Sequence, residues 1–319
     1  MTEIQKMSLD DALPELREGL AKQPSLPVTN PVMLWLGRIF LDVLFRLPKG
    51  VNEGVAVSVV PLGNASIRLY EPEGGGVGAG ILWIHGGGMI LGNAKMNDPL
   101  CSHYARALGV VVASVEYRLA PRHPYPAAID DCFAVWEWLQ ENGHRLGVNP
   151  QRVAVGGQSA GGGLGAALCQ RIFDIGGIQP AGQFLSYPMI DDRTAAMTDI
   201  DAVEHLIWPN KYNRFGWSAY LGHEVGRDQV PAWSVAGRRE DLSGLPTARI
   251  GVGSLDLCVD DSKSYAERLK RAGVECELDI VEGAPHGFDV LVPDADVSKA
   301  FASRTEQFLR KCLRLDDIR

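Results

Sequence analysis

The chain has 319 residues, 46% of them hydrophobic, enough for one large α/β domain with appendages or for two smaller domains. Its 31 basic and 39 acidic residues give a formal net charge of −8, which argues against nucleic-acid binding, because phosphates need clustered Lys and Arg. Six scattered cysteines without a C-x-x-C pair indicate reduced core thiols in a reducing compartment. The first residues lack the apolar core of a signal peptide, and the most apolar stretch, 32–45, is interrupted by Arg38 and Asp42. We therefore expect a cytoplasmic protein without stable membrane insertion.

The N-terminal residues 1–50 are predicted to be mainly helical. Leucines recur at helical spacing (Leu9, Leu13, Leu16 and Leu20), and a second apolar segment follows at 33–47 after three prolines. This arm is interpreted as a packing element or as half of a lid over a pocket. A membrane-surface helix is the weakest interpretation, because its polar face is not strongly basic.

From Val55 onward the pattern alternates between strands and helices. Strands are predicted at 55–60, 66–70, 80–85, 110–115, 153–155, 183–187, 248–252 and 275–281, and helices at 98–108, 127–142, 261–272 and 297–313. This alternation predicts an α/β protein with a mostly parallel sheet covered by helices on both faces. Residues 191–235 break the alternation with several aromatic side chains and are interpreted as the second part of a helical cap over an apolar pocket.

The stretch 153–164, VAVGGQSAGGGL, predicts a strand, a tight turn and a helix, with Ser159 at the apex of the turn. The flanking glycines fit a sharp turn in which side chains would collide with neighbouring backbone. Such a turn lifts the hydroxyl of Ser159 out of the sheet. It also directs the backbone N–H of Ala160 toward an oxyanion formed at an attacked carbonyl.

A second glycine-rich loop, HGGGM, follows the buried strand at 80–85 directly. Consecutive glycines at Gly86, Gly87 and Gly88 let backbone N–H groups approach an anion closely, as in an oxyanion-hole loop. His85 is interpreted as a residue that braces this loop, not as a catalytic residue.

Two further strands are followed by loops with titratable residues, Asp256 after the strand at 248–252 and His286 after the strand at 275–281. Ser159, Asp256 and His286 stand in the order nucleophile, acid, base. A serine hydroxyl needs a base to remove its proton, and an imidazole does this near neutral pH. A carboxylate fixes the imidazole tautomer; Asp256 is the first choice and Asp260 the second. A helix N-cap is the other interpretation of Asp256.

At these residues the sequence resembles the hormone-sensitive-lipase-like esterases of bacteria (family IV), which are carboxylesterases of the α/β-hydrolase superfamily. The resemblance runs from about Val55 to the C-terminus through seven motifs: HGGGM (85–89), YRLAPRHPYPAAIDD (117–131), GQSAGGG (157–163), YPMIDDR (187–193), DLSGLP (241–246), DLCVD (256–260) and GAPHGF (283–288). Residues 1–50 match that family only in position and helical character.

The resemblance implies an α/β-hydrolase fold with an eight-stranded, mostly parallel sheet flanked by helices. It divides the chain into a cap arm (1–50), a first catalytic part (51–190), a cap insertion (191–235) and a second catalytic part (236–319). It implies a triad of Ser159, Asp256 and His286, with an oxyanion hole made by the loop that contains Gly86, by the N–H groups of Gly87 and Gly88, and by that of Ala160. It also implies small ester substrates with short to medium acyl chains, no metal or other cofactor, and a homodimer as a frequent assembly.

Two departures from the family pattern concern the residues beside the site. Gln158 stands where the family more often has Asp before the serine, and it can still form a hydrogen bond. Leu257 and Cys258 replace the Pro and Leu that usually follow the acidic residue of the triad, so the sequence does not establish that this loop is rigid.

The leading hypothesis is a serine carboxylesterase, that is, a carboxylic ester hydrolase that acts through an acyl-enzyme. An amidase or small-peptide hydrolase on the same scaffold is the alternative. A non-catalytic ligand receptor is disfavoured because His286 is present, and a true lipase because no large apolar lid or signal peptide is evident.

Overall fold

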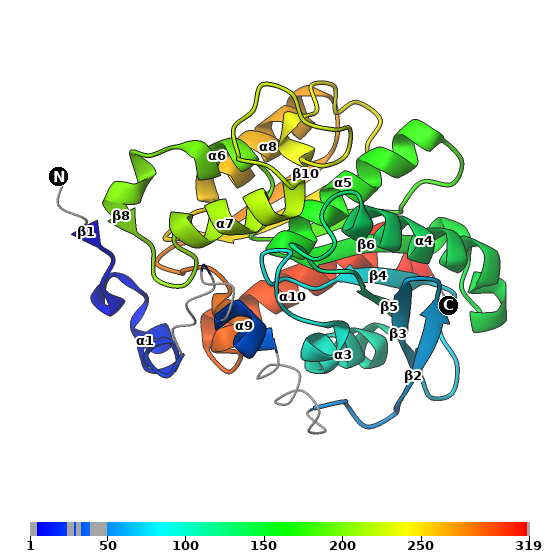
Figure 1. Cartoon of the computed structure of the whole chain (residues 1–319). Helices are drawn as coiled ribbons and strands as arrows, with labels where there is room; N and C mark the ends of the chain where they lie inside the picture. Colours follow the sequence, from blue (N-terminus) through cyan, green and yellow to red (C-terminus); the bar gives the residue numbers. More distant parts are fainter. Residues whose placement is uncertain (1–4, 24–28, 30–32, 39–49, 318–319) are drawn as a thin grey trace.

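The computed structural model describes residues 5–23, 29, 33–38 and 50–317. Within these residues an eight-stranded sheet forms the centre of the molecule, in the order β10-β9-β7-β6-β4-β5-β3-β2 (Figure 1). The strands are β2 (Val55–Leu62), β3 (Ala65–Pro72), β4 (Gly80–Ile84), β5 (Val111–Glu116), β6 (Val153–Gln158), β7 (Gln183–Ser186), β9 (Ala248–Gly253) and β10 (Cys276–Val281). β3 pairs antiparallel with both β2 and β5, and the other neighbours are parallel.

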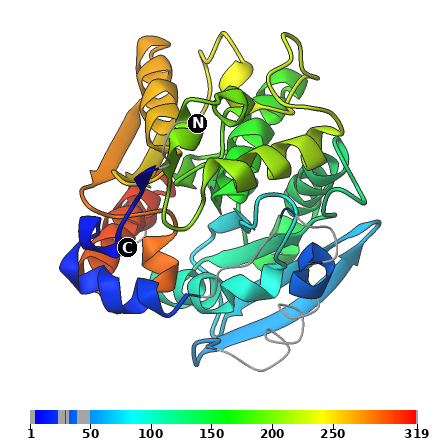
Figure 2. The same cartoon turned by 60° about the vertical axis from the view of Figure 1, so that its left-hand side comes forward.

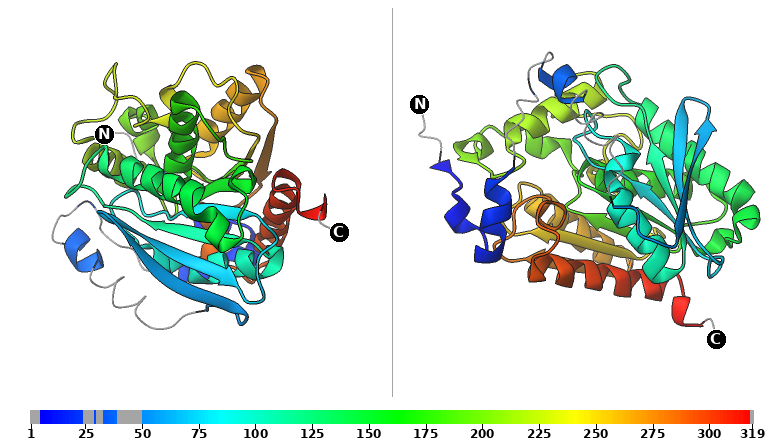
Figure 3. Two further views of the ribbon diagram at one scale, coloured as in Figure 1. Left: turned by 90° about the vertical axis from the view of Figure 1, so that its right-hand side faces the viewer. Right: turned by 90° about the horizontal axis from the view of Figure 1, so that it is seen from below.

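Helices cover both faces of this sheet. Successive side chains of a strand point to opposite faces, so neighbouring residues of one strand pack against different helices. On one face, Leu82 belongs to a core built with α4 (Ala127–Asn142), α5 (Ala160–Ile175) and α8 (Val259–Arg271). On the other face, its neighbour Trp83 packs with α3 (Asp98–Leu108) and α10 (Asp296–Cys312). Figure 3 shows these layers from two further directions. The predicted α/β class with an eight-stranded, mostly parallel sheet is confirmed.

The N-terminal segment contacts two parts of the chain that are distant in sequence. Strand β1 (Gln5–Lys6) pairs in parallel with β8 (Val203–Glu204), and Met7 N–H donates to the carbonyl of Glu204 at 3.1 Å. Helix α1 (Pro14–Ala21) buries Leu16 and Leu20 against Phe288 and Phe301. Figure 2 shows this segment, in dark blue, beside the orange segment that follows β10. The leucine spacing thus predicted the buried face of α1, whereas β1 had no sequence signal.

The segment between β7 and β9 contains α6 (Asp192–Ala196), the short β8 and α7 (Asn210–Leu221). α7 lies directly against the loop after β4, since a Cβ atom on Gly216 would come within 2.7 Å of the carbonyl oxygen of Gly88. Residues 33–38 are helical, as predicted, and the rest of the apolar segment, 39–47, lies outside the described residues. The division into cap and catalytic parts at residues 50, 190 and 235 stays a prediction.

All six cysteines are described, and all are free (Cys101, Cys132, Cys169, Cys258, Cys276 and Cys312). Five are buried and Cys312 is half-buried. Burial raises the pKa of every one of these thiols, to about 11 for Cys276 and about 12 for Cys312. The prediction of core thiols is confirmed. Among the described residues no helix combines the length and the apolarity needed to cross a membrane.

Candidate active site

Ser159 occupies the sharp turn between β6 and α5. Its backbone has φ 54° and ψ −121°, a strained conformation for a residue with a side chain. The turn is possible because Gly161 lies against the end of β4, where a Cβ atom would overlap the carbonyl oxygens of Ile84 and His85. The N–H of Ser159 donates to Ser186 at 2.9 Å, and the N–H of Met189 donates to Ser159 at 2.9 Å. Backbone packing therefore fixes the position of the Ser159 hydroxyl.

Asp256, His286 and Ser159 form a continuous hydrogen-bonded line. His286 Nε2 lies 2.8 Å from Ser159 Oγ, and His286 Nδ1 lies 2.8 Å from Asp256 Oδ2. Asp256 is 1% exposed and His286 is 7% exposed, so water screens these contacts poorly. Asp260 does not contact His286; it is an exposed residue of the first turn of α8 and pairs with Lys263. The structure thus brings together the first-choice acid, the base and the serine.

The HGGGM loop lies beside this line. A Cβ atom on Gly86 would be 3.2 Å from the Cβ of Ser159. Gly87 and Gly88 have φ +112° and +62°, which side chains disfavour, and in the described part of the chain their N–H groups donate to no carbonyl. Ala160 is the first residue of α5, so its N–H belongs to the group that a helix leaves unpaired. These N–H groups are available to a developing negative charge.

His85 braces the start of this loop. It is fully buried, its Nδ1 lies 2.7 Å from the carbonyl oxygen of Gly86, and its ring stacks on Tyr117 at a centroid distance of 4.2 Å. The hydroxyl of Tyr117 donates to the backbone carbonyl of His85 at 3.0 Å. Burial lowers the pKa of His85 to about 4, which is consistent with the predicted bracing role of a neutral imidazole.

The protonation of His85 should make the protein less stable in acid. The unfolded chain takes up this proton below its ordinary pKa of 6.5, whereas the folded chain takes it up only near pH 4. The stability due to neutral His85 is therefore complete above pH 6.5 and falls by about 3 kcal/mol as the pH drops to 4. Urea unfolding from pH 7.5 to 4.5 should show a smaller loss in His85→Gln than in the wild type and in the exposed control His144→Gln. Equal losses in all three proteins would contradict this expectation.

Two aromatic rings flank the imidazole of His286. Tyr187 presents its ring in an edge contact at a centroid distance of 4.9 Å, and its hydroxyl donates to Asp289 Oδ1 at 2.9 Å. Trp208 stacks on the same imidazole, with a centroid distance of 6.1 Å and an interplanar angle of 25°. Burial raises the pKa of Asp289 above its usual range. Sequence reasoning missed Tyr187, Trp208 and Asp289 as part of the site, although the motif YPMIDDR begins with Tyr187 and the motif GAPHGF ends directly before Asp289.

The two departures from the family pattern are accommodated by hydrogen bonds. Gln158 is buried, and its Oε1 accepts from Asn97 Nδ2 at 3.4 Å, as its predicted hydrogen-bonding capacity allows. In the acid loop the N–H of Cys258 donates to Asp256 Oδ1 at 2.8 Å, and the N–H of Leu255 donates to Ala284 at 3.1 Å. The backbone therefore orients Asp256 without a proline after it.

One group of three potential metal ligands occurs among the described residues, namely Asp256, Cys258 and His286, whose ligand atoms lie within 4.8 Å of one another. The nitrogen of His286 that faces this group is already bonded to Asp256. Burial raises the pKa of the Cys258 thiol well above its usual value, so the thiolate that a metal needs is disfavoured. These contacts fit a hydrogen-bonded acid and base better than a metal centre.

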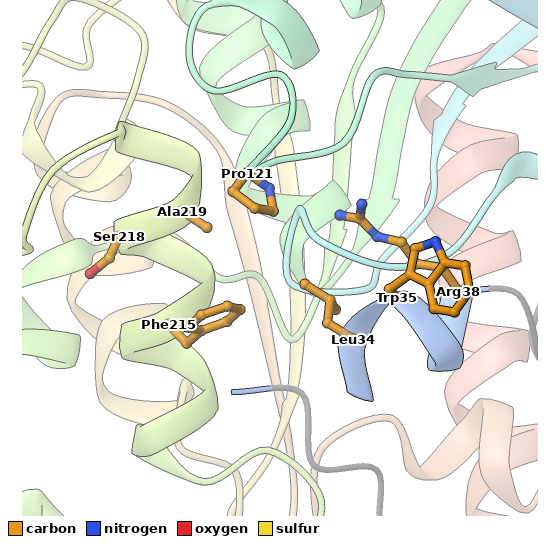
Figure 4. Close-up of a pocket in the computed structure, with 7 residues that line it drawn as sticks. All are labelled: Leu34, Trp35, Arg38, Pro121, Phe215, Ser218 and Ala219. Atoms are coloured by element: carbon orange, nitrogen blue, oxygen red, sulfur yellow. The ribbon is translucent and has the colours of Figure 1, made fainter. Parts of the chain in front are cut away.

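A cavity of about 360 Å³ lies between α7 and the helix at 33–38 (Figure 4). Its lining is mostly apolar: Leu34, Trp35, Arg38, Pro121, Phe215, Ser218 and Ala219. Arg38 Nε donates to the carbonyl of Ile90 at 2.8 Å, and its guanidinium also donates to the carbonyl of Ala120. The cavity is not lined by Ser159, Asp256 or His286; Arg38 connects it to the loop that follows Gly88.

A family model described as the alpha/beta hydrolase fold matches residues 81–290. Esterase LipI of Mycobacterium tuberculosis is 31% identical over 296 residues, which are 89% of this chain and 83% of that protein. Among solved structures, a bacterial heroin esterase aligns with a TM-score of 0.87 and 33% identity over 96% of this chain and 99% of its own. An esterase of the bacterial hormone-sensitive lipase family aligns with a TM-score of 0.76 and 27% identity over 94% and 99% of the two chains.

The chain belongs to the α/β-hydrolase family, since the family model covers more than half of it and agrees with the sheet described above. Within that family its relationship to the hormone-sensitive-lipase-like esterases, predicted from the sequence, is confirmed.

Proposed function

We propose that the chain is a serine carboxylesterase that hydrolyses esters of short to medium acyl chains. Ser159 is the nucleophile, His286 is the base, and Asp256 is the carboxylate that orients His286. The observation that carries the proposal is the hydrogen-bonded line from Asp256 through His286 to Ser159, with two contacts of 2.8 Å. The enzyme class itself, a carboxylic ester hydrolase, is confirmed by relatives and structural neighbours that are named esterases.

In the proposed first half-reaction, Ser159 Oγ attacks the ester carbonyl while His286 Nε2 takes the hydroxyl proton. The carbonyl oxygen becomes negative and accepts hydrogen bonds from the N–H groups of Gly87, Gly88 and Ala160. His286 then gives its proton to the departing alcohol, which leaves an acyl group on Ser159. Asp256 keeps the imidazole in the tautomer that has its proton on Nδ1, and it stabilises the imidazolium.

The second half-reaction uses the same groups, but Ser159 is now the leaving group and water is the nucleophile. Water replaces the alcohol, His286 removes its proton, and the hydroxide attacks the acyl-enzyme carbonyl. The carbon–oxygen bond to Ser159 breaks, and His286 returns its proton to Ser159 Oγ. The acid leaves, and no external oxidant or reductant is needed.

Hydrolysis of p-nitrophenyl esters from acetate to palmitate tests the proposed substrate range. We expect kcat/KM to be highest among the short and middle chains and at least about tenfold lower for palmitate, because each methylene that a pocket cannot hold lowers the binding of the transition state. A maximum at palmitate would contradict the acyl range.

Two further measurements separate this proposal from its alternatives. Faster turnover of an acyl p-nitroanilide than of the matched ester would favour the amidase. A fluorophosphonate that labels the wild type but not Ser159→Ala would support the nucleophile, and no labelling of the wild type would contradict it. The homodimer and the cytoplasmic location stay predictions, which sedimentation velocity and cell fractionation test.

A further inference from the structure

Trp208 contacts both halves of the candidate site. Its indole stacks on the imidazole of His286, with ring centroids 6.1 Å apart. It also covers Gly88, because a Cβ atom there would overlap Cη2 of the indole and lie 2.9 Å from Cζ2. The proposed base and the proposed oxyanion loop thus share one large side chain, which comes from the insertion before α7.

The indole is held firmly in this place. Trp208 is only 9% exposed, and its Nε1 donates a long hydrogen bond of 3.5 Å to Asn213 Oδ1, while Tyr212 packs against it at a centroid distance of 6.0 Å. Both partners are on α7, which itself lies against the loop at Gly88 through Gly216. Trp208 therefore cannot move away from Gly88 without a movement of α7 or a loss of these contacts.

The position of Trp208 indicates which part of a substrate it limits, if the proposed function is correct. The alcohol oxygen of the ester must lie near His286, which protonates it, and the carbonyl oxygen must lie near Gly87 and Gly88. A ring that contacts both His286 and Gly88 consequently borders the alcohol side of the reacting carbon. The acyl chain leaves this carbon in a different direction.

We infer that Trp208 is a specificity-determining residue that limits the size of the alcohol group in the ester. Removing the indole should therefore favour esters of branched alcohols over esters of unbranched primary alcohols. This inference rests on the proposed function and adds a selection by the alcohol to the proposed selection by the acyl chain.

The test compares two substrate series in the wild type and in Trp208→Ala. The alcohol series is ethyl, isopropyl and tert-butyl acetate, and the acyl series is p-nitrophenyl acetate, isobutyrate and pivalate. In Trp208→Ala the kcat/KM ratio of tert-butyl to ethyl acetate should rise by about tenfold or more, because small size differences in a pocket have effects of this order. The pivalate-to-acetate ratio should change by less than about threefold. An unchanged alcohol ratio, or a larger change in the acyl series, would overturn the inference.

Two variants control this result. Trp233→Ala removes a tryptophan of the same insertion whose Nε1 donates to Asp174 instead, and it should leave both ratios unchanged. Trp208→Phe keeps a ring in place and should give an intermediate alcohol ratio, so it also serves if the alanine variant does not fold. A Phe variant with the wild-type ratio and a folded Ala variant with the same ratio would both count against the inference.

A double-mutant cycle with Gly88→Ala tests the contact itself. In the wild-type background the new methyl group meets the indole and also requires a positive φ, whereas in Trp208→Ala only the backbone strain remains. The loss in thermal midpoint caused by Gly88→Ala should therefore be larger in the wild type. Equal losses in both backgrounds would overturn the proposed contact. Because this measurement needs no turnover, it separates a failure of the inference from a failure of the esterase proposal, which inactivity of the wild type on all esters would reveal.

Discussion

Replacing Ser159 by alanine should lower kcat for p-nitrophenyl butyrate by about four to six orders of magnitude, because a nucleophile and its base act as a unit. The hydroxyl is the atom that His286 contacts at 2.8 Å, and without it the imidazole has no proton to remove. Binding and the backbone N–H groups of the oxyanion loop would account for the remaining rate. The backbone turn at residue 159 is held by hydrogen bonds of the main chain, so the variant should fold normally.

The measurement needs both turnover and evidence of folding. Thermal unfolding of Ser159→Ala should stay within a few degrees of the wild type, whereas labelling by a fluorophosphonate should disappear. Ser58→Ala, on the exposed part of β2, is the control and should keep full activity and labelling. A folded Ser159→Ala protein with more than about one per cent of the wild-type kcat would assign the nucleophile to another residue.

Changing Asp256 to Asn should lower kcat by about three to four orders of magnitude while the fold is kept. The carboxylate accepts from His286 Nδ1 with one oxygen and from the N–H of Cys258 with the other. An amide can keep the second contact with its oxygen, and it then presents its NH₂ group to Nδ1. This favours the tautomer with the proton on Nε2, which cannot accept the proton of Ser159.

Asp260→Asn provides the matched control for this prediction, because Asp260 was the other candidate acid. Its carboxylate is exposed and pairs with Lys263 within α8, so the variant should change kcat by less than about twofold. Steady-state kinetics of both variants on one ester would decide between the two carboxylates. A larger loss in Asp260→Asn than in Asp256→Asn would reverse the assignment.

The proximity of the main site residues could be predicted from the sequence, because each of them follows a buried strand of a parallel sheet. The carboxyl ends of β6, β9 and β10 meet at one edge, so Ser159, Asp256 and His286 were expected to be neighbours. Spacing alone left Asp260 as an alternative to Asp256 for the acidic residue of the triad. The structure decides between them, because α8 begins at Val259 and turns Asp260 toward the solvent. The catalytic roles stay predictions that the variants above test.

The parts that sequence reasoning missed depend on contacts between distant segments. Trp208, Tyr212 and Phe215 recur at helical spacing, a signal that could have revealed α7, yet the aromatic content was interpreted only as a cap. No pattern within residues 203–208 indicates the pairing of β8 with β1 or the approach of Trp208 to Gly88. Both arise from how the insertion packs on the sheet.

Five of the six native thiols are buried and Cys312 is half-buried, which makes the native chain a convenient background for site-directed labelling. With raised thiol pKa values and little access to solvent, these cysteines should react slowly with maleimides at pH 7, because the thiolate is the reactive form. A single cysteine introduced in place of Ser218, on the α7 side of the cavity, would then carry a fluorophore or spin label selectively. Such a probe would report the movement of α7 during turnover without first removing any native cysteine.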